Sequence, residues 1–242
     1  LFTEIRKQIP RETMANLATV NELKPGQANV VLALAHCFWK TAQTQSAIDC
    51  FRQALQLRPD HLETRLLAAE FQMEQGQLDA TSTLLTVPDP ITTGMPIDWR
   101  DDDRWCWLSS QLAQLKGDDE TAQTLAKRAL ELRPNEREYL HGYQTLLVLT
   151  GQTESAEPIR KRAAELQACR RRLEILVLGG DLDNPTADAC GEVAALVKDR
   201  GESAQADGWS RLADHLRNDR RSGGPEVSVA PALTRQPARD GE

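Results

Sequence analysis

The sequence predicts an all-α fold built as a solenoid of antiparallel helix pairs. The chain is rich in Ala, Leu, Glu, Gln and Arg, which are strong helix formers, and it lacks long β-branched runs. Residues 47–61 (AIDCFRQALQLRPDH) align with residues 121–136 (TAQTLAKRALELRPNE). Prolines near the ends of such segments recur at a regular spacing along the chain. This regularity is typical of repeat proteins, in which stacked repeats bury one continuous core.

The prolines give the length of the repeat. Pro25 and Pro59 are 34 residues apart, and Pro59 and Pro134 are 75 apart, which equals two periods plus seven residues. The extra residues fall in a stretch rich in Pro, Gly and Asp (PDPITTGMPIDWRDDD), a composition typical of a loop. We therefore expect one further repeat and a loop insertion between Pro59 and Pro134.

The unit at residues 28–61 carries the clearest motif. The motif residues of its first helix are Leu34, Ala35 and Phe38. Those of its second helix are Ala47, Phe51 and Ala54, and Pro59 closes the unit. With these residues the unit resembles the tetratricopeptide repeat (TPR) family, whose members repeat a 34-residue helix–turn–helix. It departs from the family at Val31, where Trp is usual, and at Ala42, where the turn usually has Gly. The resemblance implies a right-handed α-α superhelix.

Simple packing rules explain why these residue types recur. Small side chains such as Ala35 and Ala47 let two helices approach closely. Turn glycines such as Gly76 and Gly117 permit the positive φ that ends a helix. The organisation expected from the spacing is residues 1–27 as the end of a preceding repeat, 28–95 as two repeats, 96–102 as a loop insertion, 103–170 as two repeats, 171–186 as a connector, 187–217 as a degenerate helix pair and 218–242 as a flexible tail or linker.

The composition argues against two classes of partner. The formal net charge is −7, and an acidic chain repels a phosphate backbone, so we expect no nucleic-acid partner. No segment approaches the roughly 20 apolar residues of a membrane span. Five scattered cysteines without a CxxC pair slightly favour a soluble, cytoplasmic setting. Because the chain starts at Leu1, we read it as a piece of a longer protein whose targeting signal would lie upstream. Nothing in the sequence indicates an oligomeric state.

No motif in the sequence predicts an enzyme. The GxGxxG, Walker, HExxH and GxSxG patterns are absent. His36 and Cys37 are adjacent, so on a helix they point about 100° apart, which suits a shared nucleophilic site poorly. Residues 181–184 (DLDN) lack the Gly of a calcium loop, so a turn is expected there. We expect no catalytic residue, no metal site and no cofactor.

Residues 160–172 form the strongest basic cluster. Glu165 interrupts it, and no aromatic side chains are interleaved for base stacking, so a solvated helix face is the favoured interpretation. The alternative that stays open is an RNA-binding helical repeat, whose affinity would fall steeply with salt.

The TPR resemblance implies a partner-binding groove. In a stack of helix pairs the first helix of each pair lines the concave face, and in this family positions 2, 5, 9, 12 and 13 of the repeat face it. An alternative for Trp39 and Trp107 is packing between repeats or under the insertion. The implied partner-binding residues are Asn29, Leu32, His36, Trp39, Lys40, Leu66, Glu70, Met73, Glu74, Arg104, Trp107, Gln111, Gln114 and His141. The same positions also hold Glu63, Leu115, Glu138, Thr145, Val148 and Leu149.

The leading functional hypothesis is a protein-interaction scaffold that binds a peptide or protein segment in this groove. Trp and Arg are frequent anchors of protein interfaces, and Met adapts to varied ligands. The alternative is a structural or regulatory helical-repeat region that packs against another domain of a longer parent protein.

Overall fold

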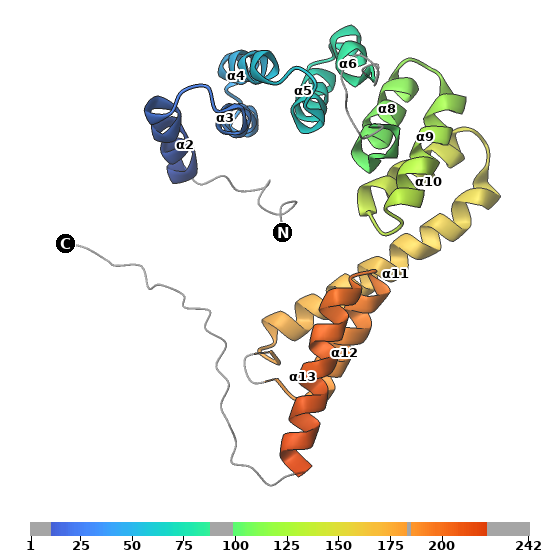
Figure 1. The fold of residues 1–242 in the computed structure, drawn as a ribbon. Helices are drawn as coiled ribbons and strands as arrows, with labels where there is room; N and C mark the ends of the chain where they lie inside the picture. The colour runs from blue at the N-terminus through green and yellow to red at the C-terminus, as the bar shows by residue number, and fades with distance from the viewer. Residues whose placement is uncertain (1–10, 88–98, 183–184, 222–242) are drawn as a thin grey trace. The chain divides into compact units, whose positions relative to one another are not determined.

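The computed structural model describes residues 11–87, 99–182 and 185–221. Every regular element within these ranges is helical, which confirms the predicted all-α fold (Figure 1). The chain divides into two compact units, residues 1–152 and residues 153–242. None of the described helices combines the length and apolar character needed to cross a membrane.

The first unit is a series of helix pairs. The first helices of the pairs, α3, α5, α8 and α10, each have 13 residues. They begin at residues 28, 62, 103 and 137, the first positions of the four 34-residue units. The elements are α2 (Arg11–Leu23), α3 (Ala28–Lys40), α4 (Thr44–Leu57), α5 (Leu62–Glu74), α6 (Leu78–Leu85), η1 (Trp99–Asp101), α8 (Asp103–Leu115), α9 (Asp119–Leu132) and α10 (Arg137–Leu149).

Small residues lie where paired helices meet. Ala35 of α3 and Ala47 and Ala54 of α4 are fully buried, so the two backbones pack closely. The rings of Phe51 and Phe71 fill the space between this pair and α5, with centroids 5.1 Å apart. The core is therefore continuous from one repeat to the next, as a solenoid requires.

The turns within the pairs have a left-handed residue at one fixed place. Gly76 and Gly117 have φ of 72° and 79°, as expected for turn glycines. Ala42, which replaces the usual Gly, adopts the same conformation with φ of 58°. A Cβ in this region is strained, so the first repeat keeps its turn at an energetic cost.

The insertion between the second and third units is anchored at both of its described ends. Helix α6 has 8 residues, whereas α4 and α9 have 14. The Arg65 guanidinium donates hydrogen bonds to the carbonyl oxygens of Thr83, Leu84 and Thr86. These bonds cap the C-terminal end of this short helix. It also lies over the buried ring of Trp99, 5.0 Å from the centroid. Of the expected loop at 96–102, residues 96–98 lie outside the described ranges.

The second unit contains α11 (Thr153–Leu178), α12 (Ala187–Asp199) and α13 (Ser203–Arg221). Helices α12 and α13 form a helix pair, and Leu176 of α11 packs with Val193, Val197 and Ala206 in their core. Helix α11 continues beyond residue 170, because residues 171–178 contain no Pro or Gly. The first part of the expected connector at 171–186 is thus helical. Of the expected tail at 218–242, residues 218–221 belong to α13 and the rest lies outside the described ranges.

Candidate partner-binding face

The predicted binding positions lie on four first helices, α3, α5, α8 and α10. We use "first-helix face" for the side chains at positions 2, 5, 9, 12 and 13 of these helices. Side-chain contacts connect this face from one repeat to the next. Its members fall into two groups, buried side chains that support the face and exposed side chains.

Trp39 belongs to the buried supports. Its side chain is 8% exposed and meets the rings of Phe51 and Phe71 edge-on, with centroids 6.3 and 5.9 Å away. The indole Nε1–H donates to Oε2 of Glu74 in the next repeat at 2.7 Å. The ring therefore packs between repeats, as the alternative interpretation proposed, while its polar edge reaches the face.

Charged and aromatic side chains gather around this bond. The Lys40 ammonium lies 3.4 Å from the Trp39 ring centroid and 3.9 Å from Oε1 of Glu74. The ring of His36 packs edge-on against Trp39, 5.6 Å between centroids. Leu32 is buried beneath them. Three predicted residues of α3, His36, Trp39 and Lys40, are thus brought together with Glu74 of α5.

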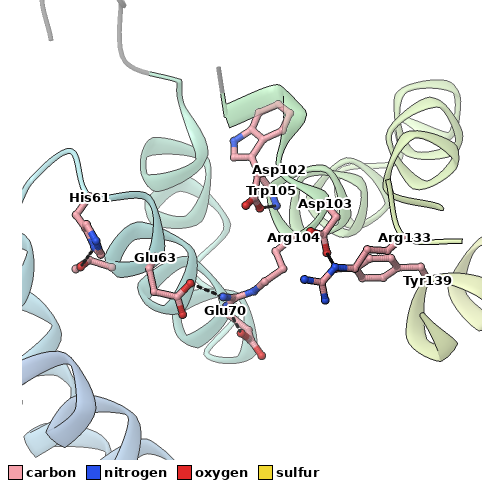
Figure 2. Close-up of polar contacts among 10 residues, drawn as sticks. His61, Glu63, Glu70, Asp102, Asp103, Arg104, Trp105, Arg133 and Tyr139 are labelled. Atoms are coloured by element: carbon pink, nitrogen blue, oxygen red, sulfur yellow. Dashed lines mark hydrogen bonds and ion pairs between the residues drawn. The ribbon is translucent and has the colours of Figure 1, made fainter. Parts of the chain in front are cut away.

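Arg104 links α8 to α5 (Figure 2). Its Nη1 donates to Oε2 of Glu63 at 2.5 Å, and its Nη2 lies 3.8 Å from Oε2 of Glu70. Burial acts to lower the pKa of the Arg104 guanidinium, but the Glu63 hydrogen bond and the charges of Glu63 and Glu70 raise it overall. The start of α8 is fixed by Asp102, whose Oδ1 accepts the backbone N–H of Trp105 at 2.9 Å.

Trp107 links α8 to α10 in the same way that Trp39 links α3 to α5. Its side chain is 7% exposed, its ring lies against Tyr139 with centroids 5.2 Å apart, and its Nε1–H donates to Oε1 of Glu138 at 2.9 Å. The backbone at Gly142 makes room for it, since a Cβ built there would lie 1.9 Å from the ring. The Tyr139 hydroxyl donates to Oδ2 of Asp103 at 2.7 Å.

Sequence reasoning included Glu63 and Glu138 among the positions but missed Tyr139 and Gly142. Tyr139 occupies position 3 of its repeat, outside the predicted set, and Gly142 is a helical glycine rather than a turn glycine. One signal was present, because Gly142 lies three residues after Tyr139 and so falls on the same side of α10.

The remaining predicted residues differ in exposure. Leu66 is fully buried, Met73, Gln111 and Gln114 are partly buried, and Asn29 and His141 are exposed. Asn29 accepts a hydrogen bond from Arg58 at 3.5 Å. The face ends in aliphatic side chains that are unusually open, namely Leu115 (57% exposed), Val148 (48%) and Leu149 (69%).

The buried thiols of Cys106 and Cys37 have little nucleophilic character. Cys106 is fully buried, its Sγ lies 3.2 Å from the carbonyl oxygen of Arg100, and burial raises the pKa of its thiol to about 11. Burial also raises the pKa of Cys37, the neighbour of His36. In the described part of the chain no group of His, Cys, Asp and Glu side chains is arranged to hold a metal ion.

Comparison with known proteins bears on the fold. The tetratricopeptide repeat family matches residues 42–90. No curated protein sequence matches the chain. One similar solved structure is PilW, a type IV pilus biogenesis factor, with 16% identity and a TM-score of 0.54 over 88% of this chain and 87% of that chain. A second is the MamA RS-1 ArsTM double mutant, with 17% identity and a TM-score of 0.53 over 69% of this chain and 89% of that chain. A third is MamA AMB-1, with 21% identity and a TM-score of 0.50 over 65% of this chain and 89% of that chain. At these identities the similarity concerns the fold alone. Residues 42–90 therefore match the tetratricopeptide repeat family, and the described helix pairs have the fold of a tetratricopeptide repeat solenoid.

Proposed function

We propose that the chain is a protein-interaction scaffold whose first-helix face forms a concave groove for a peptide or protein segment. The single observation that carries the proposal is the set of hydrogen bonds that cross between repeats. Trp39 bonds to Glu74, Arg104 to Glu63, and Trp107 to Glu138. These bonds order the face before any partner arrives, which reduces the entropy lost on binding.

The buried and exposed members of the face have different roles in this proposal. Trp39, Trp107, Leu32 and Leu66 are buried and support the face from below. The exposed or partly exposed members contact the partner, and these are Asn29, His36, Lys40, Glu70, Met73, Glu74, Arg104, Gln111, Gln114 and His141. A scaffold of this kind acts by binding alone, with no cofactor and no chemical step.

A second candidate function rests on a different surface. In the second unit the aliphatic side chains of Ile175, Val177 and Leu178 at the end of α11 are exposed. Such side chains would be covered if this unit packed against another domain of a longer parent protein. Hydrogen exchange of the α11 amides tests this function, because exchange would be slower in the parent protein than in this chain.

The test of the scaffold function uses exposed residues, since substitution of the buried tryptophans would also alter the packing between repeats. A double variant, Lys40→Glu with His141→Ala, alters both ends of the face. A matched control, Arg52→Glu with Lys127→Ala, alters exposed side chains on the second helices α4 and α9. Both are used to capture proteins from the source lysate after circular dichroism has shown native helicity. Loss of the same captured protein from the face variant alone supports the proposal, and equal capture by both variants contradicts it.

A further inference from the structure

The first-helix face carries more carboxylates than cations. Its two cations are Lys40 and Arg104, and its four carboxylates are Glu63, Glu70, Glu74 and Glu138. The side chains of Glu63 and Glu74 are 46% and 53% exposed. The cations that lie against these two carboxylates are only 24% and 31% exposed. The face therefore presents negative charge to a ligand.

Glu74 keeps one carboxylate oxygen open to a ligand. Its Oε2 accepts the Trp39 indole N–H at 2.7 Å. The Lys40 ammonium lies over the Trp39 ring and 3.9 Å from Oε1 of Glu74, which is beyond the length of a hydrogen bond. Lys40 thus leaves Oε1 able to accept a charge-assisted hydrogen bond, which is stronger than a bond between neutral groups.

Residues at the same position of successive repeats lie next to each other on this face. Lys40 and Glu74 both occupy position 13, and their charged groups are 3.9 Å apart. Glu63 and Arg104 both occupy position 2, and they are hydrogen-bonded (Figure 2). Each position therefore forms a row that crosses from one repeat to the next.

The row at position 13 changes from charged to aliphatic. After Lys40 and Glu74 it continues with Leu115 of α8 and Leu149 of α10, whose side chains are more than half exposed. Helices α5 and α8 are in contact, and the ring of Trp107 joins α8 to α10. Exposed aliphatic side chains beside charged groups are typical of a protein-interaction site.

The spacing of this row sets the spacing of a ligand. Neighbouring packed helices are about 8–10 Å apart. An extended chain rises about 3.3 Å per residue, so one step between helices corresponds to about three residues of ligand. A basic side chain at Glu74 thus places an aliphatic side chain at Leu115 about three residues away, and one at Leu149 about six residues away.

We propose that the partner of the first-helix face is an extended basic segment with a Lys or Arg at Glu74 and aliphatic side chains at Leu115 and Leu149. The inference rests on the proposed function, because it assigns the chemistry of the partner to the same face. An acidic segment is rejected, since its carboxylates would lie against those of α5.

The test begins with a displayed library of random twelve-residue peptides and the full chain as bait. Enriched peptides should contain more Lys and Arg than Asp and Glu, with an aliphatic residue about three positions from a basic one. An enriched peptide, labelled with fluorescein, is then titrated by fluorescence anisotropy. Its affinity should fall at high salt, because the contacts at Glu74 are exposed.

Two variants with the same change in charge locate the basic contact. Glu63→Gln with Glu74→Gln keeps acceptors for Arg104 and Trp39, and it should weaken the peptide about fivefold through lost charge. The matched control is Asp49→Asn with Glu131→Gln, which alters carboxylates of similar exposure, 55% and 52%, on the second helices α4 and α9. The control should leave affinity unchanged.

A second pair of variants locates the aliphatic contact. Leu149→Ser should weaken the peptide about tenfold, because an aliphatic contact is lost. Leu57→Ser changes an exposed leucine on α4 and should have no effect. A peptide whose basic residues are replaced by Gln tests the charge without altering the protein, and it should bind more weakly.

Three results overturn the inference, namely no enrichment from the library, enriched peptides without an excess of basic residues, and equal effects of the face variants and their controls. If the library gives one of these results while the lysate experiment still identifies a partner for the face, only this inference fails. The scaffold function then stands with a partner of different chemistry.

Discussion

Gly142 on α10 offers the sharpest test of how the repeats are joined. It is helical, so Ala at this position would ordinarily stabilise the helix by about 1 kcal/mol. A Cβ there would lie 1.9 Å from Cη2 of Trp107 and 2.8 and 2.9 Å from two further ring atoms. Real Cβ atoms do not approach so closely, so Gly142→Ala must move a buried indole.

The displaced ring loses two contacts. It would leave the stacking position on Tyr139 and lengthen the 2.9 Å hydrogen bond to Glu138. Overpacking costs about 1–3 kcal/mol, and the weakened hydrogen bond costs about 1 kcal/mol more. After the gain in helix propensity is subtracted, the net loss in unfolding free energy is about 2 kcal/mol. For a domain of this size, that loss lowers Tm by about 4–8 °C.

Urea unfolding followed by circular dichroism measures this change. Gly208→Ala on α13 is the matched control, because that glycine has open space around its Cβ position and should gain about 0.5–1 kcal/mol. In a second background, Trp107→Phe removes the clashing atoms, so adding Gly142→Ala there should cost little. A Gly142→Ala variant as stable as the parent would refute the close approach between α8 and α10.

Three further predictions concern other parts of the first unit. Ala42→Gly should raise the unfolding free energy by about 0.5–1 kcal/mol in urea titrations, since glycine removes the strain at positive φ. Arg65→Met should lower it by about 2 kcal/mol and quench or shift the emission of Trp99, because the carbonyls at the end of α6 lose their donors. Burial raises the pKa of Cys106 to about 11, so roughly one thiol in a thousand is ionised at pH 8 and iodoacetamide should leave it unmodified. Its labelling should rise as the pH approaches 11. Labelling at pH 8 in the native protein would contradict the burial of this side chain.

The sequence predicted those features that follow from a single repeat. The starts of α3, α5, α8 and α10 depend on the proline period and on the turn residues, both of which are visible along the chain. The burial of Ala35, Ala47 and Ala54 follows from the small side chains that closely packed helices require. The left-handed turn at Ala42 is the exception within this group. There the fold imposes a conformation that the residue itself disfavours.

Contacts between repeats could not be predicted from the same patterns. Whether Trp39 and Trp107 are open to a ligand depends on which side chains the next repeat places against them. Glu74 and Glu138 are 35 and 31 residues away, and no local pattern pairs them with an indole. The extent of α11 is another case, because the 34-residue period ends the fourth unit at residue 170, whereas the helix continues to Leu178.

Trp39 and Trp107 illustrate how a buried residue can contribute to the proposed binding face. Each indole packs its ring among apolar side chains and donates its single N–H to a carboxylate of the next repeat, Glu74 or Glu138. An indole has no acceptor, so this arrangement satisfies it completely and leaves the carboxylate with unused acceptor capacity toward solvent. The same carboxylates therefore hold neighbouring repeats in register and remain available to a basic side chain. Under the proposed scaffold function, loss of either tryptophan should change partner affinity through the position of the carboxylate, without any contact between the indole and the partner.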